Sequence, residues 1–367
     1  MNTCKRCALG LLLGLAAPVF AAPLGDRLER PSRVAADARH EPLTDVQRIG
    51  DRLVMVGANG HILLRHADGK VQQARVPVDL LLTAVHFVDE RNGWAVGHDG
   101  VILHSGDGGQ SWIKQLDGVA INALMLKWAE AEVARLQAAS VAADDEALDN
   151  AMFALDDARA GAASGPSRPL LDVWFRDARE GWAVGAYGMI VHTVDGGQSW
   201  EYLSGLDNPE RLHLNAVLGL ADGSLLVAGE GGGLHRSNDG GRTWQPARQL
   251  TQASLYRLLQ LADGRLLALG FGGTLLSSQD QGQSWQSIAL PVRAGLYGGE
   301  QLADGSLLLA GQGGVLLASR DGRNFTPWQG KSRSALLGVA AIDAGQLVLI
   351  GSAGLQVLPL SGIEEQR

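Results

Sequence analysis

The sequence predicts an all-β fold, namely a seven-bladed β-propeller with an inserted α-helical hairpin. Three observations lead to this prediction. A strand, a Gly-x-x-Gly loop and a second strand recur seven times; a tight-turn motif follows most copies; and one spacing between copies is twice the others. A period near forty residues with four short strands is typical of propeller blades. A stacked solenoid is the weaker alternative, because no copy resembles a polar capping repeat.

Composition agrees with a packed, exported domain. The chain has 367 residues, of which 46% are hydrophobic and 19% charged, so it is able to bury a large core. The 49 glycines recur at regular intervals, which indicates repeated tight turns. The formal net charge of −8 argues against general nucleic-acid binding.

Residues 1–21 are predicted to be a signal peptide. Basic residues 5–6 precede an apolar run at 8–17, and small residues lead to a cut after Ala21. The apolar run is too short for a permanent transmembrane helix, although an uncut membrane anchor remains the alternative. A cleaved leader predicts a periplasmic or otherwise exported protein.

Both cysteines, Cys4 and Cys7, lie in this leader. The mature domain, residues 22–367, then has no cysteine, so we expect no disulfide partner and no cysteine-based redox or metal site.

The repeat is marked by the glycine that ends the second strand of each blade. Successive spacings are 40, 88, 44, 41, 41 and 40 residues. The doubled spacing predicts an insertion between blades two and three. The seven glycines are Gly57, Gly97, Gly185, Gly229, Gly270, Gly311 and Gly351.

A second motif, of the form Ser/Thr-x-Asp-Gly-Gly-x-Ser/Thr-Trp, is an Asp box. Its carboxylate is expected to accept backbone N–H bonds across a tight turn, and its tryptophan to pack between blades. We therefore interpret these residues as structural. They are Asp107, Asp195, Asp239, Asp280 and Asp321 with Trp112, Trp200, Trp244 and Trp285.

The seventh repeat lacks a fourth strand after Leu358, and residues 31–38 precede the first complete repeat without an assigned place. An open sheet edge is a liability. We therefore expect residues 31–38 to supply the outer strand of blade seven and close the ring.

The insertion, residues 118–165, has the pattern of two helices. Leu124, Trp128 and Arg135 fall at helical spacing, and eight acidic residues outnumber three basic ones. The insertion joins an outer strand to the next inner strand, so we expect it on the face of the Gly-x-x-Gly loops, overhanging the mouth of the central channel. A long decoration is often functional; a passive packing lid is the alternative.

The Asp boxes, together with Gly-Trp-Ala-Val-Gly at 93–97 and 181–185, resemble the Ycf48/HCF136 family of photosystem II assembly factors, which have BNR-type repeats. The resemblance covers about residues 42–358, apart from the insertion. It implies a non-enzymatic scaffold, or an assembly or stability factor, whose partner is a membrane protein or membrane complex. It also implies an arginine-rich patch, for which Arg257, Arg293 and Arg333 are the candidates.

The face with the Gly-x-x-Gly loops is the predicted partner-binding face, because its loops vary while the opposite face repeats nearly identical turns. For the loop of blade two, plain solvation is the alternative to a ligand contact. The candidate loop residues are His98, Asp99, Tyr187, Glu230, Phe271 and Gln312.

Asp boxes also occur in sialidases, so a glycan-binding or glycoside-hydrolase propeller is the alternative function. Tyr187, Tyr256 and Tyr297 with Glu230 and Glu300 would be its groups, but the Arg-Ile-Pro motif is missing and the repeat count is seven rather than six. We assign no catalytic residue, cofactor or metal.

Two histidines need no functional explanation. His104 and His192 occupy the same repeat position just before an Asp box, so we attribute them to blade geometry.

Overall fold

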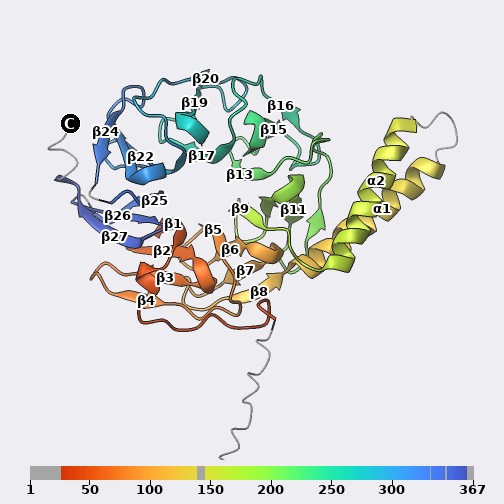
Figure 1. Cartoon of the computed structure of the whole chain (residues 1–367), viewed down its shortest axis with the longest axis horizontal. Helices are drawn as coiled ribbons and strands as arrows, with labels where there is room; N and C mark the ends of the chain where they lie inside the picture. The colour runs from red at the N-terminus through yellow and green to blue at the C-terminus, as the bar shows by residue number, and fades with distance from the viewer. Residues whose placement is uncertain (1–25, 139–144, 331, 344, 362–367) are drawn as a thin grey trace, which may run out of the picture.

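The computed structural model describes residues 26–138, 145–330, 332–343 and 345–361. Seven antiparallel sheets surround a central axis, and the predicted seven-bladed propeller with a helical insertion is confirmed (Figure 1). The predicted signal peptide and its cut after Ala21 lie outside the described residues.

Within each blade the strands follow one another from the channel to the rim. Blade one has β1 (Leu43–Ile49), β2 (Arg52–Gly57), β3 (Ile62–Arg65) and β4 (Val71–Gln73); blade two has β5 (Leu82–Phe87), β6 (Gly93–Gly97), β7 (Ile102–Ser105) and β8 (Ile113–Leu116). Blade three has β9 (Leu170–Phe175), β10 (Gly181–Gly185), β11 (Ile190–Thr193) and β12 (Glu201–Tyr202); blade four has β13 (Leu214–Gly219), β14 (Leu225–Gly229), β15 (Leu234–Ser237) and β16 (Gln245–Pro246). Blade five has β17 (Leu255–Gln260), β18 (Leu266–Gly270), β19 (Leu275–Ser278) and β20 (Gln286–Ser287); blade six has β21 (Leu296–Gln301), β22 (Leu307–Gly311), β23 (Val315–Ser319) and β24 (Thr326–Gln329). Blade seven has β25 (Leu336–Ala341), β26 (Gln346–Gly351) and β27 (Gly354–Pro359).

The repeated glycine at the end of each second strand permits a close backbone approach. A Cβ atom on Gly97 would lie 2.4 Å from the carbonyl oxygen of Leu81, and one on Gly185 would lie 2.3 Å from that of Pro169. A side chain there would collide with the backbone that leads into the first strand of the same blade. The spacing of these glycines therefore reports blade geometry directly.

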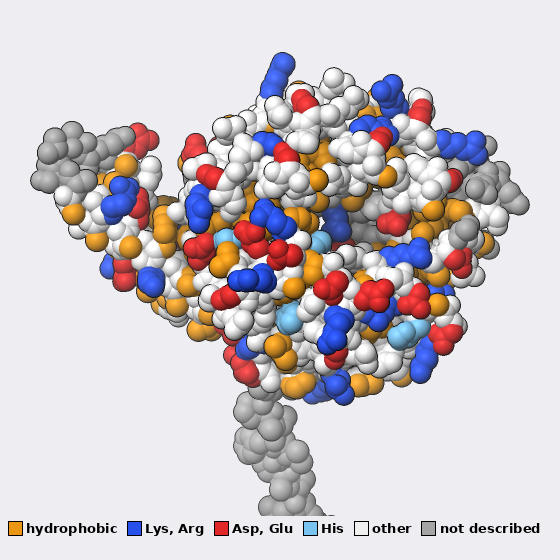
Figure 2. All heavy atoms as spheres, turned by 180° about the vertical axis from the view of Figure 1, so that it is seen from behind, with side chains coloured by type: hydrophobic (Ala, Val, Ile, Leu, Met, Phe, Trp, Pro, Cys, Tyr) orange, Lys and Arg blue, Asp and Glu red, His pale blue; other side chains and the backbone are white. Residues whose placement is uncertain are grey.

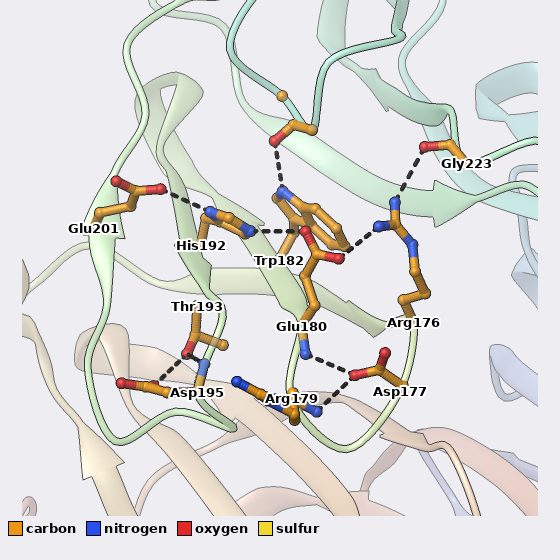
Figure 3. Close-up of polar contacts among 12 residues, drawn as sticks. Arg176, Asp177, Arg179, Glu180, Trp182, His192, Thr193, Asp195, Glu201 and Gly223 are labelled. Carbon is orange, nitrogen blue, oxygen red and sulfur yellow. Dashed lines mark hydrogen bonds and ion pairs between the residues drawn. The ribbon is translucent and has the colours of Figure 1, made fainter.

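The Asp box forms the hydrogen bonds that the sequence suggests. In blade three, Asp195 Oδ1 accepts a bond from the Thr193 hydroxyl at 2.9 Å (Figure 3). Asp195 Oδ1 also accepts a bond from the Ser199 amide at 2.9 Å, and Oδ2 accepts one from the Ser199 hydroxyl at 2.6 Å. These bonds lower the pKa of Asp195 to about 2. Asp107, Asp239 and Asp280 make the same three bonds in their blades.

The two histidines before Asp boxes pack against core tryptophans. His104 lies 4.8 Å from Trp94, and His192 lies 4.8 Å from Trp182, measured between ring centroids. His192 also contacts Glu201, at 2.7 Å, and Glu180, at 3.4 Å (Figure 3). The repeated histidine therefore has the same packing position in both blades.

The expected closing strand is absent from the described part of blade seven, so the prediction for residues 31–38 is wrong. This segment forms no strand; its Ala35 amide donates to Gln73 and its Ser32 amide to Val76, which holds it on blade one. Blade seven has three described strands. Blades seven and one instead meet through a shared hydrophobic cluster, in which Leu43 and Met55, together with Ala38 of the N-terminal segment, pack with Val348 and Ile350.

The insertion consists of α1 (Gly118–Ala138) and α2 (Asp145–Ser164), which pack against each other. The pair leaves the ring at the rim, near β8, and points away from the central axis (Figure 1). The expectation that it overhangs the channel mouth is therefore wrong. The reason is that its buried residues, such as Ile121, Met125 and Ala158, belong to the core between blades two and three, so only the base of the hairpin is anchored. In the part of the chain that the structure describes, no helix has the length and apolar character needed to cross a bilayer.

Candidate functional site

A cleft lies where the helical hairpin meets the loops of blades three and four. We call it the hairpin cleft. It encloses a cavity of about 150 Å3. Its main side chains come from α1, from the segment before β9, from the Gly-x-x-Gly loop of blade three, from β12 and from the loop after β12. They are Met125, Trp128, Arg168, Tyr187, Tyr202 and Arg211.

Aromatic rings and guanidinium groups form the walls of the hairpin cleft. The Trp128 and Tyr202 rings meet edge to face, with centroids 5.4 Å apart. The Arg168 guanidinium lies 5.5 Å from the Tyr187 ring, and that of Arg211 lies 5.1 Å from the Phe153 ring. Such stacked cation–aromatic surfaces are typical of polypeptide recognition.

Two of these aromatic side chains remain available to solvent. Tyr187 is 53% exposed and Phe153 is 65% exposed. Figure 2, which views the molecule from behind, shows hydrophobic side chains along the hairpin and charged side chains of both signs near the central hollow. The hairpin and its base therefore expose apolar surface that the propeller does not cover.

One carboxylate forms ion pairs with both arginines of the cleft. Asp157 on α2 lies 2.7 Å from Arg168 and 3.0 Å from Arg211. Burial acts to raise the pKa of Asp157, but the hydrogen bonds from the two arginines outweigh it and lower the pKa below its ordinary value. Two cations thus share one anion, which leaves one positive charge in excess among these three groups.

The backbone of two cleft residues has left-handed geometry. Tyr187 has a φ of 59° and Arg211 a φ of 55°. At the position of Tyr187, blades four to six carry glycine, with φ between 62° and 69°, while blades one and two carry Asn59 and Asp99. A bulky side chain in this conformation costs on the order of 1–2 kcal/mol, and such strain clusters at functional sites.

The structure brings Tyr187 and Glu230 to the same place. His213 donates its backbone amide to Glu230 Oε2 at 2.8 Å, and its Nδ1 lies 2.9 Å from the same oxygen. The His213 ring in turn lies 5.0 Å from the Tyr187 ring. Glu230 therefore positions, through His213, the wall that Tyr187 forms.

The other predicted loop residues lie around the same face but outside the hairpin cleft. The loop of His98 and Asp99 packs on the base of α1. The two backbones approach so closely that a Cβ atom on Gly118 would lie 2.6 Å from the Asp99 carbonyl oxygen. Phe271 is 56% exposed on blade five, and the Gln312 side chain accepts a bond from the Gly295 amide at 3.3 Å.

The three predicted arginines do not form one patch. Arg293 and Arg333 are exposed, each next to a Gly-x-x-Gly loop, of blade five and blade six respectively. Arg257 lies on inner strand β17 opposite Leu269, next to the Gly-x-x-Gly loop of blade five, and its side chain pairs with Asp45 of blade one, 3.1 Å away. Its role in partner binding stays a prediction.

Three of the groups considered for glycoside chemistry lie near one another. The Tyr256 and Tyr297 rings are 5.3 Å apart; burial raises the pKa of Tyr256, and the charges of Tyr297 and Glu230 raise it further. Glu230 also contacts His213. Burial raises the pKa of Glu300 to about 7.

Sequence reasoning missed Arg168 and Arg211 because both lie in connections outside the repeat. One trace of Arg211 was present: the spacing from Gly185 to Gly229 is 44 residues, whereas the other spacings that do not contain the insertion are 40 or 41. The additional residues lengthen the connection between β12 and β13, which carries Arg211.

Comparison with known proteins agrees with this description. The family model "Photosynthesis system II assembly factor YCF48" matches residues 165–252. The curated "Photosystem II assembly lipoprotein Ycf48" of Synechococcus sp. (strain CC9902) is 35% identical over 71 residues, which cover 19% of this chain and 20% of that protein. The match thus spans about a fifth of the relative's length.

Solved structures share the fold. "YCF48 bound to D1 peptide" has a TM-score of 0.60 at 18% identity, covering 88% of this chain and 93% of that one. YCF48 from Cyanidioschyzon merolae has a TM-score of 0.59 at 15% identity, covering 89% and 97%. A streptogramin B lyase has a TM-score of 0.63 at 11% identity, covering 90% and 97%, so the architecture alone does not define a function. Residues 165–252 are thus similar to the Ycf48 family, and the two YCF48 structures share the repeat-propeller fold of the chain.

Proposed function

We propose that this chain is an exported, non-enzymatic assembly or stability factor that holds a polypeptide segment of a membrane protein or membrane-associated complex in the hairpin cleft. The family-model match supports this location, because residues 165–252 include Arg168, Tyr187 and Arg211. The name of the matching family and the peptide-bound YCF48 structure support the class of function.

The observation that carries the proposal is Tyr187. Its backbone has left-handed geometry at a position where three other blades have glycine. Its side chain is 53% exposed and lies beside the guanidinium group of Arg168. A tyrosine here lowers the stability of the fold and does not fill the core, so its presence is better explained by function than by folding. Contact with a partner supplies that function.

The chemistry of the cleft defines the segment that fits it. Aromatic walls favour an apolar or aromatic side chain. The excess positive charge of Arg168 and Arg211 over Asp157 favours a carboxylate next to that side chain. The cavity is small, about 150 Å3, so it accommodates one side chain of an extended segment rather than a folded domain.

The experiment is site-specific photo-crosslinking in the native host. A photoreactive phenylalanine analogue replaces Tyr187 in one strain and Phe271 in another, since both residues are exposed aromatics in Gly-x-x-Gly loops. We expect position 187 to crosslink a membrane protein and position 271 to give at least about tenfold less of the same product.

A third probe, placed at position 153 on the hairpin, tests the cleft arginines. Arg168→Gln and Arg211→Gln should reduce the crosslink from this probe, whereas the control Arg293→Gln should not. A crosslink of equal yield from positions 187 and 271, or one insensitive to both cleft arginines, would contradict the proposal.

A further inference from the structure

The outermost strand of blade seven has an open edge. The other six blades place a fourth strand outside the third, whereas β27 is the last described strand of its sheet. Figure 1 places β27 at the periphery of the ring, on the side away from the helical hairpin.

The side chains of β27 are more exposed than those of comparable strands. All four residues of β3 and of β11 are buried, as are four of the five in β23. In β27 only Gly354 is buried; Leu355 and Leu358 are partly exposed, and Val357 is 44% exposed. The apolar residues of β27 are thus less covered than those of these third strands: Leu355 and Leu358 pack only partly against neighbouring clusters, and Val357 is exposed.

The hydrogen-bond register shows which backbone groups face outward. The Leu360 amide donates to the Gly345 carbonyl, and the pairing with β26 continues in the same register. Because inward and outward groups alternate in an antiparallel pair, the N–H and C=O groups of Leu355 and Val357 point away from β26. Among the described residues, these groups have no backbone partner.

The usual protection of an edge strand is weak at this position. Edge strands are commonly blocked by charged side chains, bulges or proline. Residues 354–360 carry no charge, and the pairing of β26 with β27 has no bulge. Proline appears only at the end of the strand, at position 359.

Neither end of this chain suits the edge. After β27, the Leu360 amide still bonds to the Gly345 carbonyl and Ser361 has helical geometry, so the described chain beyond β27 adds no strand to the edge. At the other end, Gln73 of blade one contacts Ala35, and Ala38–His40 packs against the start of β27, where a Cβ atom on Gly354 would lie 2.2 Å from the Arg39 carbonyl oxygen. Among the described residues this segment makes no backbone hydrogen bond to the edge of β27.

A second copy of the chain is also disfavoured. Stable protein–protein interfaces bury about 1,200–2,000 Å2, far more than the edge of a six-residue strand provides. A separate extended segment, by contrast, pairs with the edge and also inserts alternate side chains beside the partly exposed leucines and valine.

We propose that β27 binds a short extended segment of another polypeptide, which completes blade seven as its fourth strand. The fourth strands of the other blades have two to four residues, for example Glu201–Tyr202 and Ile113–Leu116, so the bound segment is of similar length. Because the edge is uncharged, the segment is apolar at alternate positions. This site is independent of the hairpin cleft.

The first test is amide hydrogen exchange in the mature protein, resolved by residue. We expect the outward amides of Leu355 and Val357 to exchange at least about a hundredfold faster than the third-strand amides of complete blades that bond to a fourth strand. Equal protection in the free monomer would overturn the proposal, because the edge would already be covered.

The second test uses a fluorescent, capped peptide, Ser-Trp-Ile-Lys-Gln-Leu, which contains the fourth strand of blade two (Ile113–Leu116) and the two residues before it. Saturable binding is expected by about 1 mM. Methylating one alternate set of peptide amides should weaken binding at least about tenfold, and methylating the other set should change it by less than about twofold.

A matched pair of variants locates the site. Val357→Pro removes one outward N–H without touching the bonds to β26, and Val357→Thr keeps that N–H. Val357→Pro should abolish peptide binding, whereas Val357→Thr should retain it. Absence of peptide binding, equal binding by both variants, or a dimer that Val357→Pro dissolves would overturn the proposal.

Discussion

Arg257 on β17 and Asp45 on β1 form an ion pair with 3.1 Å between Nη2 and Oδ1, although their strands belong to blades five and one. Both residues follow a bulge in an inner strand, and all seven inner strands have this bulge. The residue that follows the bulge is small in four of the seven inner strands, which leaves room for the Arg257 side chain to reach Asp45 on blade one. The seven are Asp45, Ala84, Asp172, Ala216, Arg257, Gly298 and Gly338.

Replacing Arg257 with methionine should destabilise the ring. Asp45 is 5% exposed, and it would lose its cationic partner. Breaking a buried pair costs about 3–5 kcal/mol; the Arg257 side chain keeps 30% of its surface exposed, so we expect about 2–3 kcal/mol. Urea denaturation at pH 7 measures this decrease in the free energy of unfolding. Arg257→Lys, which keeps the charge, is the control, and a methionine variant of wild-type stability would contradict the assignment.

The same arginine limits the pKa of a second channel carboxylate. Burial raises the pKa of Asp172 to about 6, while the charge of Arg257 acts to lower it. In Arg257→Met the pKa of Asp172 should therefore rise further. Carbon-13 NMR titration of the Asp172 carboxyl group would measure it; an unchanged pKa would show that the two groups do not interact.

Glu300 should make stability fall as pH rises. Burial raises its pKa from 4.5 to about 7, so the folded chain binds this proton more tightly than the unfolded chain. The resulting stabilisation is complete below about pH 4.5 and is lost between about pH 4.5 and 7. Glu300→Gln should remove that slope and be more stable than the wild type by about 2 kcal/mol at pH 8. Equal pH profiles of denaturation midpoints would refute this.

The Asp boxes should have the opposite pH dependence. The pKa of Asp195 is lowered to about 2, so its contribution is present above about pH 3.8 and is lost as pH falls toward 2. Asp195→Ala removes three hydrogen bonds and should cost on the order of 1–3 kcal/mol at pH 7. Asp195→Asn keeps an acceptor oxygen and should cost less. Partner crosslinking per folded molecule should not change in either variant.

Position 187 separates binding from stability. Glycine adopts left-handed geometry without steric cost, so Tyr187→Gly should be about 1 kcal/mol more stable than Tyr187→Ala. Both variants lose the aromatic ring and should lose partner contact equally. Thermal unfolding and the crosslink from position 153 provide the two readouts. A less stable glycine variant would mean that the backbone at this position is not strained.

Features that every blade shares could be predicted from the sequence. Gly97 and Gly185 are required by a backbone approach that each blade repeats, and Asp195 by a turn that most blades repeat. The two helices within residues 118–165 could also be predicted, because apolar residues there recur with the period of an α-helix rather than that of a strand.

Features that occur once could not be predicted. The direction of the hairpin depends on how Met125 and Ala158 pack between two blades, which periodicity does not encode. Arg257 resembles a surface arginine in sequence, and only the ring brings Asp45 opposite it. Residues 31–38 were assigned by elimination, without a pairing pattern of their own.

In the described part of the chain the ring closes without a strand shared between its two ends, and this has a consequence for how the chain folds. A propeller whose last sheet borrows an N-terminal strand cannot finish that sheet until both ends of the chain meet. Here the described strands of every blade are consecutive in sequence, so each sheet forms from local hairpins of low contact order. Blades are thus able to form one after another as the chain emerges, and the junction between Met55 and Ile350 forms last. That junction is also where reversible local opening of the native ring should begin.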